Sequence, residues 1–225
     1  IIKGITKNNI YYSYLFLIIF LLLSTRPSSF PIIFAIVLFI IISKYQIVFK
    51  PKMILLSLAA VFICTPFIYS LIYYFIEFNF SGNAKIDYIT NGVKDGMIIH
   101  DRPETWVNKP DNFIDIIFIY FLRLINFFNP YASTFSIAHI LLNLLQISLI
   151  LLSISIWAVY GNYIKIFNKI FLFILLLSLS VAAFHSFILI DYDWRYRFPI
   201  LLPLIMLFPI SLEIILKKFN LTSVS

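Results

Sequence analysis

A short polar stretch near the C-terminus holds the residues of this chain that are best suited to bind a charged ligand. It reads Asp-Tyr-Asp-Trp-Arg-Tyr-Arg-Phe-Pro from Asp191 to Pro199 and separates two long apolar runs. The guanidinium groups of Arg195 and Arg197 offer planar sets of donors that match phosphate or carboxylate oxygens. Pro199 favours a helix start beside them, and helix N-termini attract anions. The stretch indicates a ligand with a phosphate headgroup; the alternative is that its charges pair with one another and with lipid headgroups.

The composition of the chain indicates whether water or lipid surrounds it. Of the 225 residues, 62% are hydrophobic and only 12% are charged. A soluble domain cannot bury that much apolar surface, so we expect lipid to surround the chain. The net charge of +7 does not indicate a nucleic-acid partner, because the charge is divided by position along the chain. The single cysteine, Cys64, excludes an intrachain disulfide and a cysteine-cluster metal site.

Six apolar runs are long enough, or nearly so, to cross the apolar core of a bilayer, which is about 30 Å thick. We therefore expect an all-α, polytopic transmembrane bundle of about six spanning helices. Residues 1–76 should hold three of them, residues 77–136 an external loop with interfacial helices, and residues 137–225 the other three with an external loop at 191–197. The apolar runs cover residues 10–23, 30–42, 53–76, 137–160, 169–190 and 198–216.

The lysines set the expected orientation, because positive charge in short loops marks the cytoplasmic side. With the N-terminus in the cytoplasm, Glu213 is the single acid on that side, and the other nine acids and all five arginines lie outside. Acids together with arginines suit chemistry on a charged ligand. The alternative is that the five arginines fall on the outer side by chance. The lysines on the cytoplasmic side are Lys3, Lys7, Lys44, Lys50, Lys52, Lys165, Lys169, Lys217 and Lys218.

The external segment contains an apolar run at residues 113–128 that carries Asp115 and Arg123. If this run crossed the membrane, the later lysines would lie outside, so we interpret it as an interfacial or re-entrant helix. We expect its polar positions, Asn112, Asp115, Arg123 and Asn126, to fall near one face. A short amphipathic helix is expected before it, around residues 86–93.

Further polar residues occur near the outer ends of two expected helices. His139, Asn143 and Gln146 share a helical face at offsets of four and seven. They indicate either the polar wall of a cavity that opens outward or hydrogen bonds between helices. His185 lies near the outer end of the next helix, where it and His139 can approach the 191–197 loop. We expect no metal site, because the spacing supplies no set of carboxylate ligands.

The stretch from Asp191 to Pro199, followed by Pro203 in an apolar helix, resembles the C-terminal signature of the GT-C superfamily of membrane glycosyltransferases. Within that superfamily it is most similar to the bacterial aminoarabinose and protein-mannosyl transferases. Thr25-Arg26-Pro27 resembles their short Arg-Pro turn, and the external loop before the last three helices resembles theirs. The resemblance covers most of this chain but only the later half of such an enzyme.

The resemblance implies transfer of a sugar from a polyprenyl-phosphate donor to a glycan, lipid or protein acceptor. Transfer would occur on the outer face of a bacterial plasma membrane, in the cell envelope, with membrane lipids as further partners and no cofactor. It implies that Arg195 and Arg197 hold the donor phosphate, and we expect Asp191 and Asp193 to orient these arginines.

Several other residues are weaker candidates for contacts with the acceptor or with a cavity around it. They are Glu77, Asp101, His139, Asn143 and His185.

The catalytic acid of that family usually lies in the first external loop, yet residues 24–30 contain no acid. We therefore expect the acid upstream of Ile1 and leave the catalytic residue unassigned. Two other classes remain open: a flippase or transporter of lipid-linked oligosaccharides, and a non-catalytic membrane subunit that binds lipid phosphates. The absence of Asp, Glu, Lys and Arg from the centres of the expected spanning helices argues against transport.

Overall fold

The computed structural model describes residues 29–44, 50–80, 82–129, 131, 135–161, 165–188 and 194–219. Within these ranges the fold is all-helical, as predicted, with seven α-helices and the short 3₁₀ helix η2 (Pro103–Thr105). The expected helix at residues 10–23 lies outside the described residues.

Four helices are long and apolar enough to cross a membrane. They are α3 (Pro51–Phe80), α6 (Ile137–Tyr160), α7 (Lys165–Ile188) and α8 (Trp194–Lys218). The apolar helix α2 (Phe30–Lys44) is shorter, with 15 residues. The described part of the chain is therefore compatible with an integral membrane protein of four candidate spans, and the count of six stays a prediction.

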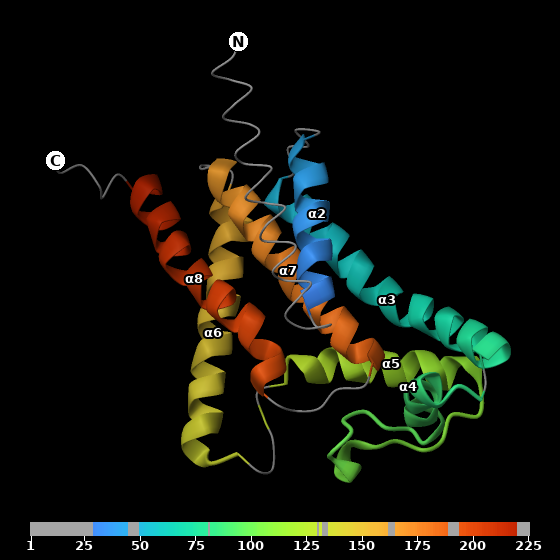
Figure 1. Cartoon of the computed structure of the whole chain (residues 1–225). Coiled ribbons are helices and arrows are strands. Elements are labelled where there is room, and N and C mark those ends of the chain that lie inside the picture. The colour runs from blue at the N-terminus through green and yellow to red at the C-terminus, as the bar shows by residue number, and fades with distance from the viewer. Residues whose placement is uncertain are drawn as a thin grey trace.

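The helices form one bundle with a crosswise helix at one end (Figure 1). In the bundle α2 packs on α7, α6 packs on α8, and α7 packs on α8. Helix α5 (Phe113–Phe127) contacts α3 and α7 and runs across them instead of along the bundle. The interfacial position of residues 113–128 stays a prediction.

The fully buried Trp157 of α6 packs near the end of the bundle where α6 ends and α7 begins. Its indole stacks on the Phe171 ring of α7 with 4.7 Å between ring centroids, and its Nε1 donates a hydrogen bond of 2.7 Å to Asn168 Oδ1. Helix α8 is tied to α6 by Ser211 Oγ, which donates to the Ser153 carbonyl at 3.1 Å. Small residues and interhelical hydrogen bonds of this kind are typical of helices that pack in lipid.

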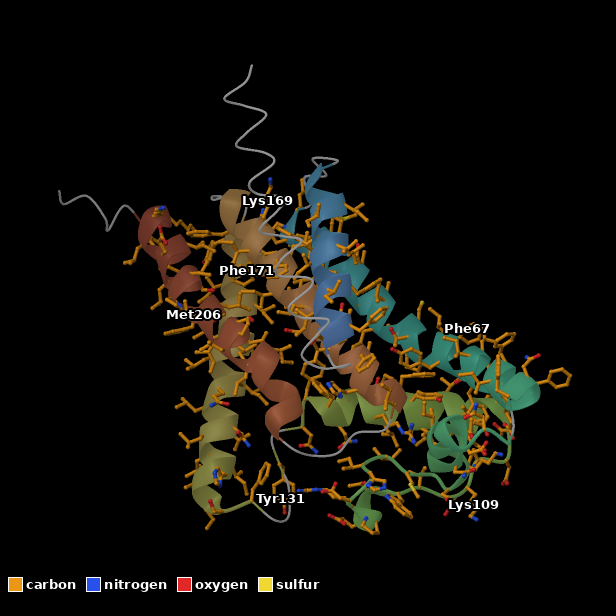
Figure 2. The ribbon with its side chains drawn as sticks, viewed as in Figure 1. Phe67, Lys109, Tyr131, Lys169, Phe171 and Met206 are labelled. Atoms are coloured by element: carbon orange, nitrogen blue, oxygen red, sulfur yellow. The ribbon has the colours of Figure 1, made fainter. Side chains whose placement is uncertain are left out.

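The two ends of the bundle differ in charge. We call the upper end in Figure 1 the lysine end. Helices α2, α6 and α8 end there, and α3 and α7 begin there. At the other end, which we call the loop end, residues 82–129 meet the end of α7 and the starts of α6 and α8. Figure 2 shows Lys169 at the first and Lys109 and Tyr131 at the second. The described lysines at the lysine end include Lys50, Lys52, Lys169, Lys217 and Lys218.

The loop end depends on a glycine turn after α4 (Ala84–Lys94). Gly96 has a φ of +71°, its N–H donates to the Val93 carbonyl, and its carbonyl accepts from Val107 N. A Cβ at this position would collide with the carbonyl oxygen of Val107, whereas Gly82, with a φ of +93°, has open space around its Cβ position. Gly96 therefore combines a left-handed backbone with a close approach of another segment of backbone, and Gly82 has the left-handed backbone alone.

We expect Gly96→Ala to open the loop end and Gly82→Ala to leave it closed. The left-handed conformation costs a residue with a Cβ about 1–2 kcal/mol, and both variants bear that cost. The Gly96 variant also has to move the backbone at Val107. Hydrogen exchange of residues 93–107 in detergent measures the difference, and equal protection in the two variants would contradict the close packing of Gly96 on Val107.

Candidate functional site: a polar cavity at the loop end

A polar cavity of about 320 Å³ lies at the loop end where α3, α4 and the start of α5 meet. The end of α3 contributes two tyrosines and a carboxylate, and the end of α4 contributes a lysine. The segment that leads into α5 closes the other side. The lining residues are Tyr73, Tyr74, Glu77, Lys94, Lys109, Pro110, Asp111, Asn112 and Ile116.

Glu77 is the predicted acceptor contact that lines this cavity. It lies one turn after Tyr73 on α3, and the buried Tyr73 side chain hydrogen-bonds its carboxylate. Lys94 Nζ lies 3.0 Å from Glu77 Oε1 and connects α4 to α3. Because both side chains of this ion pair are partly exposed, we expect it to contribute less than about 1 kcal/mol to stability. Its main effect is to hold the carboxylate at the cavity wall.

The opposite wall is fixed by the N-terminal cap of α5. Asn112 Oδ1 accepts hydrogen bonds from Ile114 N (2.8 Å) and Asp115 N (3.0 Å). In return, Asp115 Oδ2 accepts from Asn112 N (3.3 Å) and Asp111 N (3.0 Å). This capping box holds the backbone of Asp111 and Asn112 in one conformation at the rim of the cavity.

Arg123 lies near the same face of α5 as Asn112, Asp115 and Asn126, as predicted from the spacing, but it belongs to the buried edge of that face. Its side chain is fully buried in line with Ile116, Ile119 and Tyr120. Nε donates a hydrogen bond of 2.8 Å to the Met97 carbonyl, and the guanidinium lies 5.5 Å from the centroid of the Tyr120 ring. Position 123 follows position 116 by seven residues, so the helical period places it in the apolar stripe. The arginine thereby ties α5 to the loop after α4.

The other candidates for acceptor or cavity contacts have separate surroundings. Asp101 is exposed between α4 and η2. His139 is exposed at the start of α6, with Nδ1 at 3.1 Å from Ser136 Oγ, and Asn143 lies one turn further along. His185 is buried in α7, where its ring stacks on Phe127 of α5 with 5.8 Å between centroids. None of these four residues lines the polar cavity.

The predicted phosphate-binding arginines belong to helix α8 and not to the loop before it. The helix begins at Trp194, so Arg195 and Arg197 are its second and fourth residues. We predicted a start near Phe198 because proline is common at the first helical position. The earlier start adds a turn of helix. One backbone hydrogen bond of the helix is not made, because Pro199 has no N–H to donate. Asp191, Asp193 and the side chains of both arginines lie outside what the structure describes.

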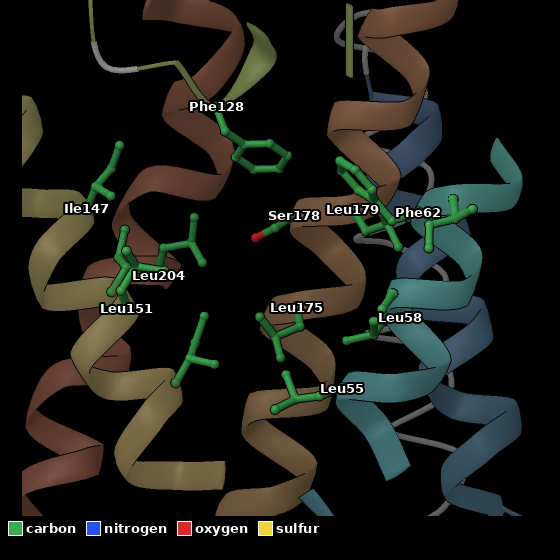
Figure 3. Close-up of a pocket in the computed structure, with 14 residues that line it drawn as sticks. Leu55, Leu58, Phe62, Phe128, Ile147, Leu151, Leu175, Ser178, Leu179 and Leu204 are labelled. Atoms are coloured by element: carbon green, nitrogen blue, oxygen red, sulfur yellow. The ribbon is translucent and has the colours of Figure 1, made fainter. Parts of the chain in front are cut away.

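An apolar groove of about 580 Å³ runs along the bundle between α3, α6, α7 and α8. Figure 3 shows Ile147 and Leu151 of α6 on one side and Leu58 and Phe62 of α3 on the other. Its one hydroxyl, that of Ser178, donates to the Ile174 carbonyl within its own helix. The lining is Leu55, Leu58, Ala59, Phe62, Ile63, Phe128, Ile147, Ile150, Leu151, Ile154, Leu175, Ser178, Leu179 and Leu204.

Among the described residues, no group of three or more His, Cys, Asp or Glu side chains is arranged to hold a metal ion. Comparison with protein-family models, with curated proteins and with solved structures found no match for this chain. The function therefore has to be argued from the cavity, the groove and the start of α8.

Proposed function

We propose that this protein is a membrane glycosyltransferase of the GT-C type, which transfers a sugar from a polyprenyl-phosphate donor at the loop end. The observation that carries the proposal is the pair of arginines in the first turn of α8. A helix N-terminus bears a partial positive charge, so two arginines in the first turn add to its attraction for an anion. A donor phosphate would supply that anion and would use the planar donor sets of both guanidinium groups.

The apolar groove supports a donor with a long hydrocarbon chain. The one polar side chain in its lining is Ser178, whose hydroxyl is bonded within its own helix. The groove therefore favours hydrocarbon over any polar ligand. Phe128, directly after α5, lies at one end of the groove, and Leu55, near the start of α3, lies at the other (Figure 3). A polyprenyl chain in the groove would therefore have its phosphate at the end of the bundle where α8 begins.

The proposed reaction is a substitution at the anomeric carbon of the donor sugar. An acceptor hydroxyl forms the new C–O bond while the bond to the lipid phosphate breaks, and a carboxylate takes the hydroxyl proton. A positioned base of this kind typically contributes about 100- to 10,000-fold. The arginines would stabilise the negative charge that develops on the departing polyprenyl phosphate. The acceptor is a glycan, a lipid or a protein in the bacterial cell envelope.

The first test is donor binding. We expect the purified chain to bind polyprenyl phosphate and polyprenyl-phosphate sugar at least tenfold more tightly than the uncharged polyprenol of equal length. The three ligands have the same hydrocarbon chain and make the same contacts in the groove. The difference in affinity therefore measures the contribution of the phosphate. Equal binding of the phosphate and the alcohol would remove the support that the arginines give to the proposal.

The proposal also requires the loop end to face outward, as the lysine rule predicts. Once the exposed Cys64 is replaced by alanine, a cysteine at the exposed Asn108 should react with an impermeant maleimide in intact cells. A cysteine at the exposed Lys169 should not react. Lys169 is preferable to its neighbour Asn168, which accepts the hydrogen bond of Trp157. The reverse labelling pattern would place the loop end in the cytoplasm and overturn the proposed site of transfer.

Transport is the alternative function, and it predicts a different distribution of ionisable residues along the spanning helices. Ion-coupled transporters usually place ionisable residues near the middle of the membrane. In the four candidate spans of the described chain, the acidic and basic residues lie near the helix ends: Lys52, Glu77, Lys165, Lys169, Arg195, Arg197, Glu213, Lys217 and Lys218. This distribution favours an enzyme that works at one membrane face.

A further inference from the structure

We infer that the polar cavity between α3, α4 and α5 is a carbohydrate-binding site for one uncharged sugar unit. If the protein is the proposed glycosyltransferase, the acceptor is then a glycan. Only this assignment of the acceptor rests on the proposed function. The inference depends on three properties of the cavity: an exposed aromatic face, a balance of charge and a small volume.

The aromatic face belongs to Tyr74. Its side chain is 44% exposed although the residue lies at the cavity wall. The ring is held by two neighbours, Tyr73 at 5.4 Å and Phe113 at 5.8 Å between ring centroids. One face of a pyranose consists of C–H groups, which carry slight positive charge and pack well against the negative face of an aromatic ring. Tyr74 therefore offers a fixed, solvent-accessible platform for such a face.

The charges around the cavity select a neutral ligand. The lining contains two lysines, Lys94 and Lys109, and two carboxylates, Glu77 and Asp111. Each lysine already faces a carboxylate, Lys94 at 3.0 Å from Glu77 and Lys109 at 3.5 Å from Asp95. A phosphate would meet no net positive charge here. A sugar hydroxyl donates and accepts hydrogen bonds at once, so it can bond to the ammonium and carboxylate groups without breaking the balance.

The size of the cavity limits the ligand further. Its volume of about 320 Å³ lies at the lower end of the range for small-molecule sites, about 300–1,000 Å³. That volume suits a single sugar unit at the end of a glycan. A lipid chain is disfavoured because four charged side chains line the cavity, and the apolar groove offers such a chain a better environment.

The test is saturation-transfer NMR on the full chain in an amphipol, since a maltoside detergent would itself present sugar. The probes are methyl β-glucoside, methyl α-mannoside and methyl β-N-acetylglucosaminide, with inorganic phosphate as the charged competitor. We expect at least one glycoside to bind. Tyr74→Ala and Glu77→Gln should each weaken that binding tenfold or more, and phosphate should not displace the sugar. Tyr131→Ala and Glu104→Gln are matched controls, because both residues are exposed at the loop end outside the cavity.

Thermal midpoints of all four variants, compared with the parent chain, separate lost binding from lost folding. If Tyr74→Ala unfolds, Glu77→Gln and Asp111→Asn, which keep the side-chain size, carry the test. The inference is overturned if no glycoside binds, if the folded cavity variants bind as well as the controls, or if phosphate competes.

The same variants separate this inference from the proposed function. Sugar binding that depends on Tyr74, in a protein that never cleaves a lipid-linked donor, would retain the carbohydrate site and reject the glycosyltransferase. Sugar transfer that proceeds normally in Tyr74→Ala and Glu77→Gln would retain the glycosyltransferase and reject the cavity as its acceptor site.

Discussion

Replacing Arg197 by alanine should lower sugar transfer by roughly tenfold to a few hundredfold, by the usual conversion of free energy to rate. Hydrogen bonds to a charged partner contribute about 1.5–3 kcal/mol each, and the donor phosphate would lose at least one of them. Arg197→Lys should restore little activity, because an ammonium group lacks the planar set of donors. The measurement is sugar transfer in membranes at matched expression, with donor binding measured separately.

Arg102→Ala is the matched control for this series, since Arg102 also lies at the loop end but precedes η2, far from α8 in the sequence. It should keep most of the transfer activity. Arg26, in the expected external turn that resembles the Arg-Pro turn of the GT-C family, provides a second comparison and lies outside the described residues. Near-normal transfer and donor binding in both Arg195→Ala and Arg197→Ala would reduce the start of α8 to an anchor at the membrane surface.

Trp157→Ala should destabilise the bundle by about 3–5 kcal/mol, the usual cost of removing a large aromatic side chain from a core. The indole is fully buried, stacks on Phe171 and donates to Asn168, so its removal leaves a cavity and an amide without its donor. Trp157→Phe should cost far less, because it keeps a ring against Phe171 and loses the hydrogen bond. That loss is worth about 0.5–1.5 kcal/mol.

The measurement is reversible unfolding in mixed micelles, followed by circular dichroism, with Asn168→Ala as the complementary variant. Asn168→Ala should resemble Trp157→Phe, since each variant removes one partner of the same hydrogen bond. If the unfolding free energy of Trp157→Ala lies within about 1 kcal/mol of that of Trp157→Phe, the indole does not fill the core between the end of α6 and the start of α7.

Hydropathy predicted the long helices well because it reports the apolar length of each one. It did not predict where the hydrogen bonding of each helix stops. Helix α3 covers Pro51–Phe80 and not residues 53–76, because its last turn consists of polar and aromatic residues that remain helical. Helix α8 begins at Trp194 for the same reason. The arginines that we had expected in a loop therefore belong to a helix.

The polar cavity was beyond prediction from sequence because its walls come from three separate segments. Of its lining, the sequence pointed only to Glu77 as a contact residue; Lys94 and Asn112 reach it through the packing of α4 and α5 on α3. Two signals were nevertheless present in the sequence. Asn112 and Asp115 have the spacing of a capping box, and Arg123 has the helical spacing of the buried stripe that begins at Ile116.

The central claim, that the protein breaks the bond between a sugar and a polyprenyl phosphate, is tested most directly in proteoliposomes. The full-length gene product that carries this sequence would be supplied with a polyprenyl-phosphate sugar labelled in both the sugar and the lipid, together with a cell-envelope acceptor extract. We predict one polyprenyl phosphate released for each sugar that appears on the acceptor, with both products reduced in parallel by Arg197→Ala. Recovery of the donor intact, whether bound to the protein or moved to the opposite leaflet, would contradict the glycosyltransferase.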